Sequence, residues 1–497
     1  MNNILQLAIA YIVSVMAVHW IFMKVLKIAK VKELVDNPDA RKLQKTPVPV
    51  LGGIAVFFGL LFGLLAFTGT SVLSSGLDPL VVVHGSVLRG IGPVLLGASI
   101  MLYVGALDDI MGLTPRARLV IEVLVMLGVN YGSGMCVDSF HGLWGIGEYS
   151  WWIAVPLTVF AGVGVINAYN MVDGVNGLSS GLCMACSVIF GGIFLKRGDV
   201  SNAALAFCFA GALVPFYVHN VFGNRSKMFI GDAGTMVMGL LVSWFIIRVL
   251  SSQNETMTHV TEGGRELSLI AMMLAVASVP VFDTLRVMTA RMLRHENPFH
   301  ADKTHLHHIF IATGVSHFVT GFSELLINLV VVGVWYAGYR CGLSIDCQLY
   351  VTIVAAVVLV WGTYIFLHYQ QKHQTKTFER FTKASRVTHL DHKAWWLALQ
   401  KVLDKGAYED YFILFKKKMN KNIEDMDNKE KDTAAIVNYM QGKKKVNVED
   451  IIKESGADAL RVYPILFELE QEGIIDVLER ASLGAVSVVK LNDLGGM

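Results

Sequence analysis

Two adjacent carboxylates, Asp108 and Asp109, directly follow the apolar run 101–107. Neighbouring negative charges repel each other, so the pair favours a bound cation or a nearby hydrogen-bond donor. Carboxylate oxygens suit a divalent ion such as magnesium, and Arg116 and Arg118 follow at a short distance, where they can meet phosphate oxygens. An ordinary solvated helix end has the same appearance, so the pair alone does not establish a site.

A second polar group recurs at every third position, at Asn167, Asn170, Asp173 and Asn176. On a helix with about 3.6 residues per turn this spacing gives one slowly drifting stripe. Gly174 beside Asp173 would let a ligand or another backbone come close. Polar groups facing lipid would be left unsatisfied, so the stripe must face a cavity or other helices. A helix-packing stripe without chemistry is the alternative.

A third carboxylate, Asp232, lies next to Gly231 at the start of an apolar run. An aspartate in this position is typical of a helix N-cap. It would equally present its oxygens to a metal ion, because the neighbouring glycine offers little steric obstruction. The motif favours neither interpretation by itself.

Three histidines stand close together, at His305, His307 and His308. They would serve as metal ligands, donate hydrogen bonds to phosphates, or have no role beyond a basic loop. Arg286 and Lys303 lie nearby in the sequence, which favours contact with a phosphate or nucleotide over zinc.

The elements that must position these residues are membrane helices. The chain has 497 residues, of which 54% are hydrophobic and only 16% charged, whereas soluble domains have about a quarter charged residues. Apolar runs of about 20 residues are long enough to cross a bilayer. Eleven such runs are predicted, roughly at 4–23, 48–67, 86–107, 117–137, 151–168, 178–195, 200–220, 233–250, 267–284, 318–340 and 348–368.

The charges of the loops predict the orientation of these spans. The loop after the first span is rich in lysine and arginine, whereas the segments 68–85, 138–150 and 251–266 hold only Arg265. Positive loops stay in the cytoplasm, so the N-terminus is expected outside and the long C-terminal segment inside. With this parity, all the polar motifs fall on the cytoplasmic side. The fold expected is an all-α polytopic membrane protein.

The ordered set of motifs resembles the polyprenyl-phosphate N-acetylhexosamine-1-phosphate transferase family, also called glycosyltransferase family 4. The segments that carry the resemblance are Asp108-Asp109, Asn-Ala-Tyr-Asn-Met-Val-Asp-Gly-Val-Asn-Gly-Leu, Phe-Ile-Gly-Asp-Ala-Gly, His-Leu-His-His and the early stretch from Arg41-Lys42 to Gly52-Gly53. The resemblance covers about residues 1–370. Its histidine motif is more similar to the bacterial branch that starts O-antigen, enterobacterial common antigen and teichoic-acid linkage units than to the muropeptide branch.

The resemblance implies an enzyme of the bacterial plasma (inner) membrane with a cytoplasmic active site. It would transfer N-acetylhexosamine 1-phosphate, GlcNAc 1-phosphate first among the candidates, from a UDP-sugar to undecaprenyl phosphate and release UMP. The implied cofactor is Mg²⁺, with Mn²⁺ as a substitute. The sugar itself is not readable from these residues.

The same resemblance suggests a role for each motif residue. Asp232 and Asn170 would bind the metal, Asp108 and Asp109 would contact the metal or position the lipid phosphate, and Asp173 would orient groups around the metal. The substrate contacts implied are Arg118, Asn167, Asn176, His305, His307 and His308. A phosphate monoester has a second pKa of about 6 and is mostly a dianion at neutral pH, so a general base is the weaker role for Asp108.

The chain departs from the family pattern at Asn176, where many relatives carry a second aspartate. An asparagine keeps an acceptor oxygen but loses the charge, so it can form a hydrogen bond but cannot act as a base. We therefore expect this position to contribute to binding.

The C-terminal segment has a different composition. Residues 371–432 read as a polar, Lys-rich helical linker, and 433–497 resemble a winged-helix domain of α+β type. Residues 446–497 hold ten acidic and four basic residues, which disfavours nucleic acid because DNA binding requires cationic contacts. A cytoplasmic protein partner is the interpretation preferred, whereas a homodimer is left open. The first 370 residues are expected to retain the core chemistry without this segment.

The sequence leaves two alternative functions open, one in the same class of enzyme and one in a different class. One is the phospho-MurNAc-pentapeptide transferase of peptidoglycan synthesis, which the sugar donor would distinguish. The other is a membrane transporter whose Asp and Asn residues bind an ion near the midplane of the bilayer. The absence of a visible inverted repeat in the sequence disfavours the transporter.

Overall fold

The structure is a computed structural model that describes residues 2–36, 47–75, 89–252, 261–262, 265–297, 303–471, 474–480 and 486–491. The chain divides into two compact units, Met1–Tyr408 and Glu409–Met497. The first unit is helical apart from the short strand pairs β1 (Val35–Asp36) with β2 (Val48–Pro49) and β3 (Thr261–Glu262) with β4 (Arg265–Glu266).

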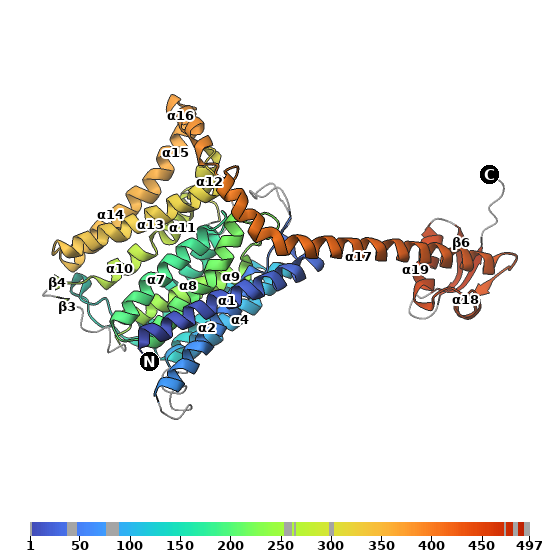
Figure 1. The fold of residues 1–497 in the computed structure, drawn as a ribbon, viewed down its shortest axis with the longest axis horizontal. Helices are drawn as coiled ribbons and strands as arrows, with labels where there is room; N and C mark the ends of the chain where they lie inside the picture. Colours follow the sequence, from blue (N-terminus) through green and yellow to red (C-terminus); the bar gives the residue numbers. More distant parts are fainter. Residues whose placement is uncertain are drawn as a thin grey trace. The chain divides into compact units, whose positions relative to one another are not determined.

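The helices of the first unit follow the apolar runs of the sequence (Figure 1). They are α1 (Asn3–Val31), α2 (Gly52–Ser75), α4 (Arg89–Met111), α5 (Pro115–Ser133), α6 (Trp151–Val172), α7 (Leu178–Lys196), α8 (Val200–Phe222), α9 (Gly231–Leu250), α10 (Leu269–Val276), α11 (Ser278–Leu293), α12 (Leu306–Ala312), α13 (His317–Arg340), α14 (Ile345–Ala356), α15 (Thr363–Lys372) and α16 (Lys376–Ser385). A π-helical turn, Val357–Gly362, joins α14 to α15.

The all-α polytopic architecture is confirmed, but the number of spans differs from the eleven predicted. Within the described residues, nine helices are long and apolar enough to cross a membrane. The predicted run 267–284 is broken into α10 and α11, which meet at 79° and would make a tenth span together. The eleventh, α5, carries Arg116, Arg118 and Glu122 and is therefore less apolar than its neighbours. Its charges belong to the site described below.

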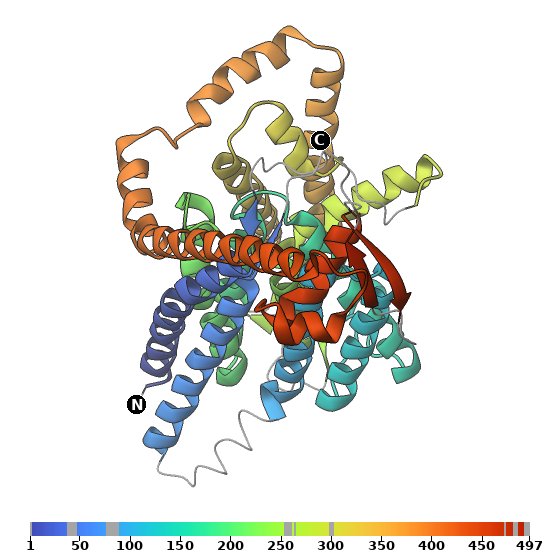
Figure 2. The ribbon, with the colours of Figure 1, turned by 90° about the vertical axis from the view of Figure 1, so that its right-hand side faces the viewer.

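Helix α9 lies at the centre of the first unit. It packs against α2, α4, α6, α7 and α10, and most of its side chains are buried, including Trp244 and Phe245. Helices α1 and α2 lie side by side along one edge (Figure 2). An apolar helix enclosed by other helices has a fixed position, so the residue at its start, Asp232, is held in place by the whole bundle.

The segment after the last span begins on the first unit. Helix α16 and the first turns of α17 (Ala394–Met440) precede the boundary after Tyr408, whereas the division expected from the sequence lay at residue 370. Ser316 at the start of α13 donates a hydrogen bond from its backbone N–H to Thr388 Oγ1 (3.0 Å). The ring of Trp396 lies 4.6 Å from that of Phe222. Residues 376–404 are therefore not a free linker.

The second unit, taken by itself, has a small core around a three-stranded sheet. Its elements are the end of α17, β5 (Val446–Asn447), α18 (Val448–Glu454), α19 (Ala459–Gln471), β6 (Ile475–Arg480) and β7 (Val486–Leu491), with strand order β5-β7-β6. Ile436, Met440, Ile451, Leu466 and Val489 are buried together. The combination of helices and a small sheet agrees with the α+β type expected from the sequence. The winged-helix resemblance and the role of this unit stay predictions.

Candidate active site

A pocket of about 630 Å³ gathers most of the predicted site residues. It lies where α4, α6 and α8 end and where α9 begins. The predicted residues that line it are Asp108, Asp109, Asn170, Asp173, Asn176, Asp232 and His308. Four sequence motifs that are far apart in the chain therefore meet at one end of the helical bundle, as the parity of the spans predicted.

Electrostatically the pocket is dominated by carboxylates. Asp36 adds a fifth to the four predicted aspartates of its lining. Among the described lining residues Lys227 is the only lysine or arginine. Residues 37–46, which include the predicted Arg41 and Lys42, lie outside the described part of the chain. An acidic pocket of this kind repels anionic substrates unless a cation accompanies them.

Asp109 caps the central helix. Its Oδ1 accepts a hydrogen bond from the backbone N–H of Asp232 (2.8 Å), and its Oδ2 accepts one from the N–H of Ala233 (3.2 Å). The first N–H groups of a helix lack partners within the helix, and a carboxylate is favoured there by the helix dipole. Gly231 has φ +72° and packs so closely on this carboxylate that a Cβ would overlap with it. Asp109 therefore fixes the start of α9.

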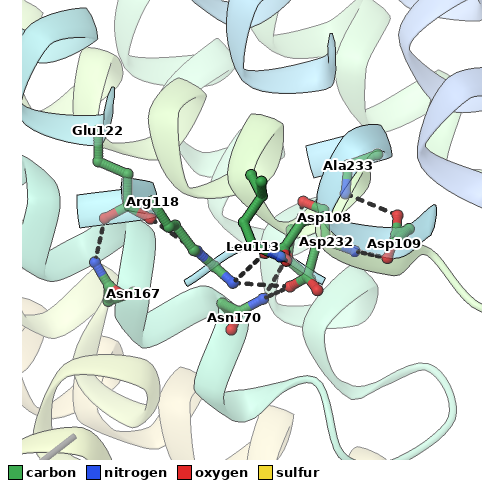
Figure 3. Close-up of polar contacts among 10 residues, drawn as sticks. Asp108, Asp109, Leu113, Arg118, Glu122, Asn167, Asn170, Asp232 and Ala233 are labelled. Carbon is green, nitrogen blue, oxygen red and sulfur yellow. Dashed lines mark hydrogen bonds and ion pairs between the residues drawn. The ribbon is translucent and has the colours of Figure 1, made fainter. Parts of the chain in front are cut away.

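Asp232 is the point where the motifs converge (Figure 3). Its Oδ1 accepts hydrogen bonds from Arg118 Nη1 (3.0 Å) and from Asn170 Nδ2 (2.5 Å). The same Arg118 nitrogen lies 3.5 Å from Asp108 Oδ2, whose other oxygen accepts the N–H of Leu113 (2.7 Å). One guanidinium thus sits between two carboxylates of the pocket and partly neutralises them.

Glu122 is a member of the site that the sequence analysis missed. It is fully buried on α5, where its Oε1 accepts from Arg118 Nε (3.0 Å) and its Oε2 accepts from Asn167 Nδ2 (2.5 Å). Figure 3 shows this chain of contacts from Asn167 to Asp232. Neither Arg118 nor Asn167 lines the pocket, so Glu122 and Asn167 act through Arg118. A glutamate in an otherwise apolar helix, four residues after an arginine, was the available signal.

Asp173 follows α6 and has a perturbed acidity. Removal from water raises its pKa to about 6, and the charge of Asp232 adds to this, whereas a hydrogen bond from Ser179 Oγ opposes it. The adjacent Gly174 packs directly against the ring of His307, where a Cβ would overlap with the imidazole. The segment of the Asn stripe is therefore in contact with the histidine motif.

The three predicted histidines have different surroundings. His308 lines the pocket, whereas His305 and His307 do not. His305 Nδ1 lies 2.8 Å from Asp283 Oδ2, and the N–H of Leu306 also donates to that carboxylate. His307 is buried, which lowers its pKa well below the ordinary value and keeps its ring neutral. His305 and His307 therefore pack inside the protein, against Asp283 and Gly174 respectively, and His308 is the one of the three that lines the pocket.

A second residue missed by the sequence analysis is Lys227, in the loop between α8 and α9. It lines the same pocket as the carboxylates and is partly buried, and this burial lowers its pKa to about 8. The lysine lies in no recognisable motif, so its contribution is visible only once the loop is folded.

The carboxylate and amide oxygens of the pocket are candidate ligands for a magnesium ion. No group of three or more His, Cys, Asp or Glu side chains in the described part of the chain forms a complete metal site. Magnesium, however, is commonly held by one or two carboxylates together with substrate phosphates and water. Asp232 and Asp108 both contact the same Arg118 nitrogen, so their carboxylates lie close together, and the amide of Asn170 offers an oxygen as well as a nitrogen. The residues therefore fit an ion that arrives with the substrate phosphates.

Comparison with known proteins supports this arrangement. The model of glycosyl transferase family 4 matches residues 91–250, which include every site aspartate except Asp36. The undecaprenyl-phosphate alpha-N-acetylglucosaminyl 1-phosphate transferase of Escherichia coli (strain K12) is 29% identical over 297 residues, which cover 58% of this chain and 72% of the relative. Its counterpart in Escherichia coli O157:H7 is 28% identical over 295 residues, with the same two coverages.

A relative from another bacterium extends the similarity. The probable undecaprenyl-phosphate N-acetylglucosaminyl 1-phosphate transferase of Bacillus subtilis (strain 168) is 28% identical over 333 residues, 66% of this chain and 83% of the relative. Together with the polytopic helical fold and the motifs that meet in one pocket, these matches support the assignment of the chain to glycosyl transferase family 4.

Proposed function

We propose that this chain transfers N-acetylglucosamine 1-phosphate from UDP-N-acetylglucosamine to undecaprenyl phosphate and releases UMP. The observation that carries the proposal is the convergence of Asp108, Asn170 and Asp232 in an acidic pocket at one end of a membrane helical bundle. Relatives named as undecaprenyl-phosphate N-acetylglucosaminyl 1-phosphate transferases are 29% and 28% identical to the chain over 297 and 333 residues. A lipid acceptor in the bilayer and a soluble donor would both reach a site at the helix ends.

The proposed reaction is a displacement at phosphorus. An oxygen of undecaprenyl phosphate attacks the phosphorus that carries the sugar and forms a new P–O bond. The bond from this phosphorus to the bridging oxygen breaks, and that oxygen leaves with UMP. The attacking phosphate is mostly a dianion at neutral pH, because its second pKa is about 6, so no side chain has to remove a proton.

The main task of the protein is therefore to overcome repulsion between two anionic substrates. Mg²⁺, or Mn²⁺ in its place, would neutralise the diphosphate and polarise the attacked phosphorus, held by Asp232 with Asn170 and Asp108. Lys227 and His308 line the same pocket and would contact phosphate oxygens. Arg118 does not line the pocket but contacts Asp108 and Asp232, and it would partly neutralise both carboxylates.

The remaining residues position this group. Asp109 uses both carboxylate oxygens to fix the start of α9, so its proposed role is to hold Asp232. Glu122 and Asn167 hold Arg118. In the proposed orientation the site faces the cytoplasm, because the end of α1, which carries Lys24, Lys27 and Lys30, leads directly to Val35 and Asp36 of the pocket lining. The membrane would then be the bacterial inner membrane.

The position of the site also bears on the transporter interpretation. A transported ion is bound near the midplane, at discontinuous helices. The acidic residues here lie instead at the last turn of α4, just after α6 and at the first turn of α9. A protein partner for residues 433–497 stays a separate prediction.

The proposal is tested with purified protein, MgCl₂ and undecaprenyl phosphate, offered a panel of UDP-sugars that includes UDP-GlcNAc, UDP-GalNAc and UDP-MurNAc-pentapeptide. The expected result is UMP release with UDP-GlcNAc, dependence on the lipid and loss of activity with EDTA. Release with UDP-MurNAc-pentapeptide alone would reassign the donor. Folded protein that releases no UMP from any UDP-sugar would refute the transferase.

A further inference from the structure

The segment after the last span reaches the active site. Its residues 388–404 pack on loops at the pocket end of the bundle, where Ser316 Oγ donates to the backbone oxygen of Thr388 (2.7 Å). Trp396 is buried against two rings, with centroids 4.6 Å from Phe222 and 5.7 Å from Phe318. The family model ends at residue 250, so Phe318 and Trp396 lie outside the matched region, whereas Phe222 lies inside it.

This segment also lines a cavity beside the pocket. The second cavity has a volume of about 450 Å³, and Asp391, Trp396 and Gln400 contribute to its wall. It shares Asn176, Lys227 and His317 with the acidic pocket. If the diphosphate of the donor binds in the acidic pocket, the rest of the donor can therefore reach the segment after the last span.

The closest connection runs through Asp404 on α17. Its Oδ1 accepts hydrogen bonds from the backbone N–H of Asn224 (3.2 Å), the N–H of Ser226 (2.8 Å) and Ser226 Oγ (2.8 Å). Ser226 is fully buried. Hydrogen bonds to a charged acceptor are stronger than neutral ones, and backbone groups of an irregular loop depend on such partners. The loop is also held by Lys30 Nζ, which donates to the backbone oxygen of Arg225 (2.7 Å).

The loop that Asp404 holds carries Lys227, directly after Ser226. Among the described residues that line the acidic pocket, this is the only lysine or arginine. Its position decides whether the carboxylate wall is faced by a cation. A change in the loop at Ser226 would displace the lysine, whereas Asp232 and Asp108 are fixed by other contacts.

We propose that Asp404 is a positioning residue of the donor site, which holds the loop between α8 and α9 so that Lys227 faces the diphosphate. The inference rests on the proposed function. It gives residues 376–408 a part in donor binding that the rest of the C-terminal segment does not share. Asp404 itself does not line the pocket, so it acts through the loop.

The test compares Asp404→Ala with Asp404→Asn and with a matched control, Lys401→Ala, in the full-length protein. Lys401 is an exposed residue on the same helix, one turn earlier, and alanine is a good helix former at both sites. We expect Asp404→Ala to raise KM for UDP-GlcNAc about tenfold and to change kcat less than about threefold, with KM for undecaprenyl phosphate unchanged. Asp404→Asn keeps one acceptor oxygen and should recover part of the loss.

A second measurement does not depend on activity. Trypsin cleaves after Arg225 and Lys227, so the loop carries its own probe. Cleavage there should be at least about fivefold faster in Asp404→Ala than in the wild type and Lys401→Ala, because local opening governs proteolysis. Equal cleavage rates would overturn the holding of the loop, and faster cleavage with an unchanged donor KM would overturn the positioning role.

The two proposals fail in different ways. If the proposed function is wrong, the wild type itself releases no UMP, and the assignment of Asp404 to a donor site falls with it. The trypsin comparison then still decides whether Asp404 holds the loop. If the wild type is active and the Asp404→Ala variant has a wild-type donor KM, only the inference about Asp404 is overturned.

Discussion

The acidic motifs and the histidine motif of this site look equally chemical in the sequence but are used differently. Asp108 and Asp232 face the pocket, and each is held by a helix end or by Arg118. Of the histidines only His308 lines the pocket, whereas His305 is paired with the buried Asp283. One motif can therefore supply both residues that line the pocket and residues that hold others in position, and only the folded structure shows which is which.

The largest effect is expected at Asp232. Asp232→Asn should lower kcat at least about 1000-fold, because the group on which Arg118 and Asn170 converge loses its charge. The melting temperature should change little, since the amide keeps an acceptor oxygen for Arg118. UMP release and differential scanning fluorimetry check the two halves. Activity within about tenfold of the wild type would remove Asp232 from the centre of the site.

Asp109→Ala should combine a loss of activity with a loss of stability. Removing the cap leaves two N–H groups of α9 without a partner, which costs about 1–3 kcal/mol of unfolding free energy. Without the cap Asp232 would be displaced, and we expect this displacement to lower kcat about 100-fold. A normal melting temperature with the same loss of activity would indicate a direct catalytic role instead of a positioning one.

The histidine comparison is tested by a matched pair of substitutions. His308→Ala should lower kcat/KM about tenfold or more at an unchanged melting temperature, because this ring faces the pocket. His305→Ala should lower the melting temperature, because Asp283 loses a buried partner. If both variants lost only activity, the histidines would act as one group and the comparison would be wrong.

The pH dependence should follow Lys227. Burial lowers its pKa from 10.5 to about 8, so the lysine is charged below this pH and loses its charge as the pH rises through it. We expect kcat/KM for UDP-GlcNAc to fall between about pH 7.5 and 9, a range in which Asp173 stays ionised. Lys227→Arg keeps its charge throughout this range and should flatten the decline. An identical profile in both proteins would exclude the lysine.

The smallest effect is expected from removing the second unit. A chain that ends after Tyr408 retains the contacts of Thr388, Trp396 and Asp404, so its kcat/KM should lie within about threefold of the full-length value. A chain that ends at residue 370 lacks them and should show a raised donor KM. Equal activity of the two truncations would restore the sequence-based expectation that the whole C-terminal segment is dispensable to the core chemistry.

Most of the helical architecture could be predicted from the sequence, because apolar runs of about 20 residues have few other folds available. The break between α10 and α11 could not be predicted, since the run 267–284 stays apolar through Ala277. The sequence predicts a span at 117–137, whereas the helix found there, α5, is charged and less apolar than the other spans. Its charges are compensated within the bundle by the Arg118–Glu122 pair, which composition alone does not reveal.

The candidate site was predictable as a set of residues but not as a set of roles. Asp108 and Asp109 are adjacent, so on a helix their side chains point about 100° apart, and only the packing of α9 shows which one caps it. Lys227 and Asp404 belong to no motif. Their contributions come from a loop and a distant helix that meet only in three dimensions.

The proposed transfer to the lipid is tested most directly by following the phosphorus atom that carries the sugar. UDP-GlcNAc labelled at this phosphorus is mixed with undecaprenyl phosphate, MgCl₂ and the full-length protein, and the label is measured in the lipid phase beside the UMP released. We expect one labelled lipid diphosphate for each UMP, and neither product in the reaction with the Asp232→Asn variant. Label that stays in water as GlcNAc 1-phosphate, or no release of UMP at all, would contradict it.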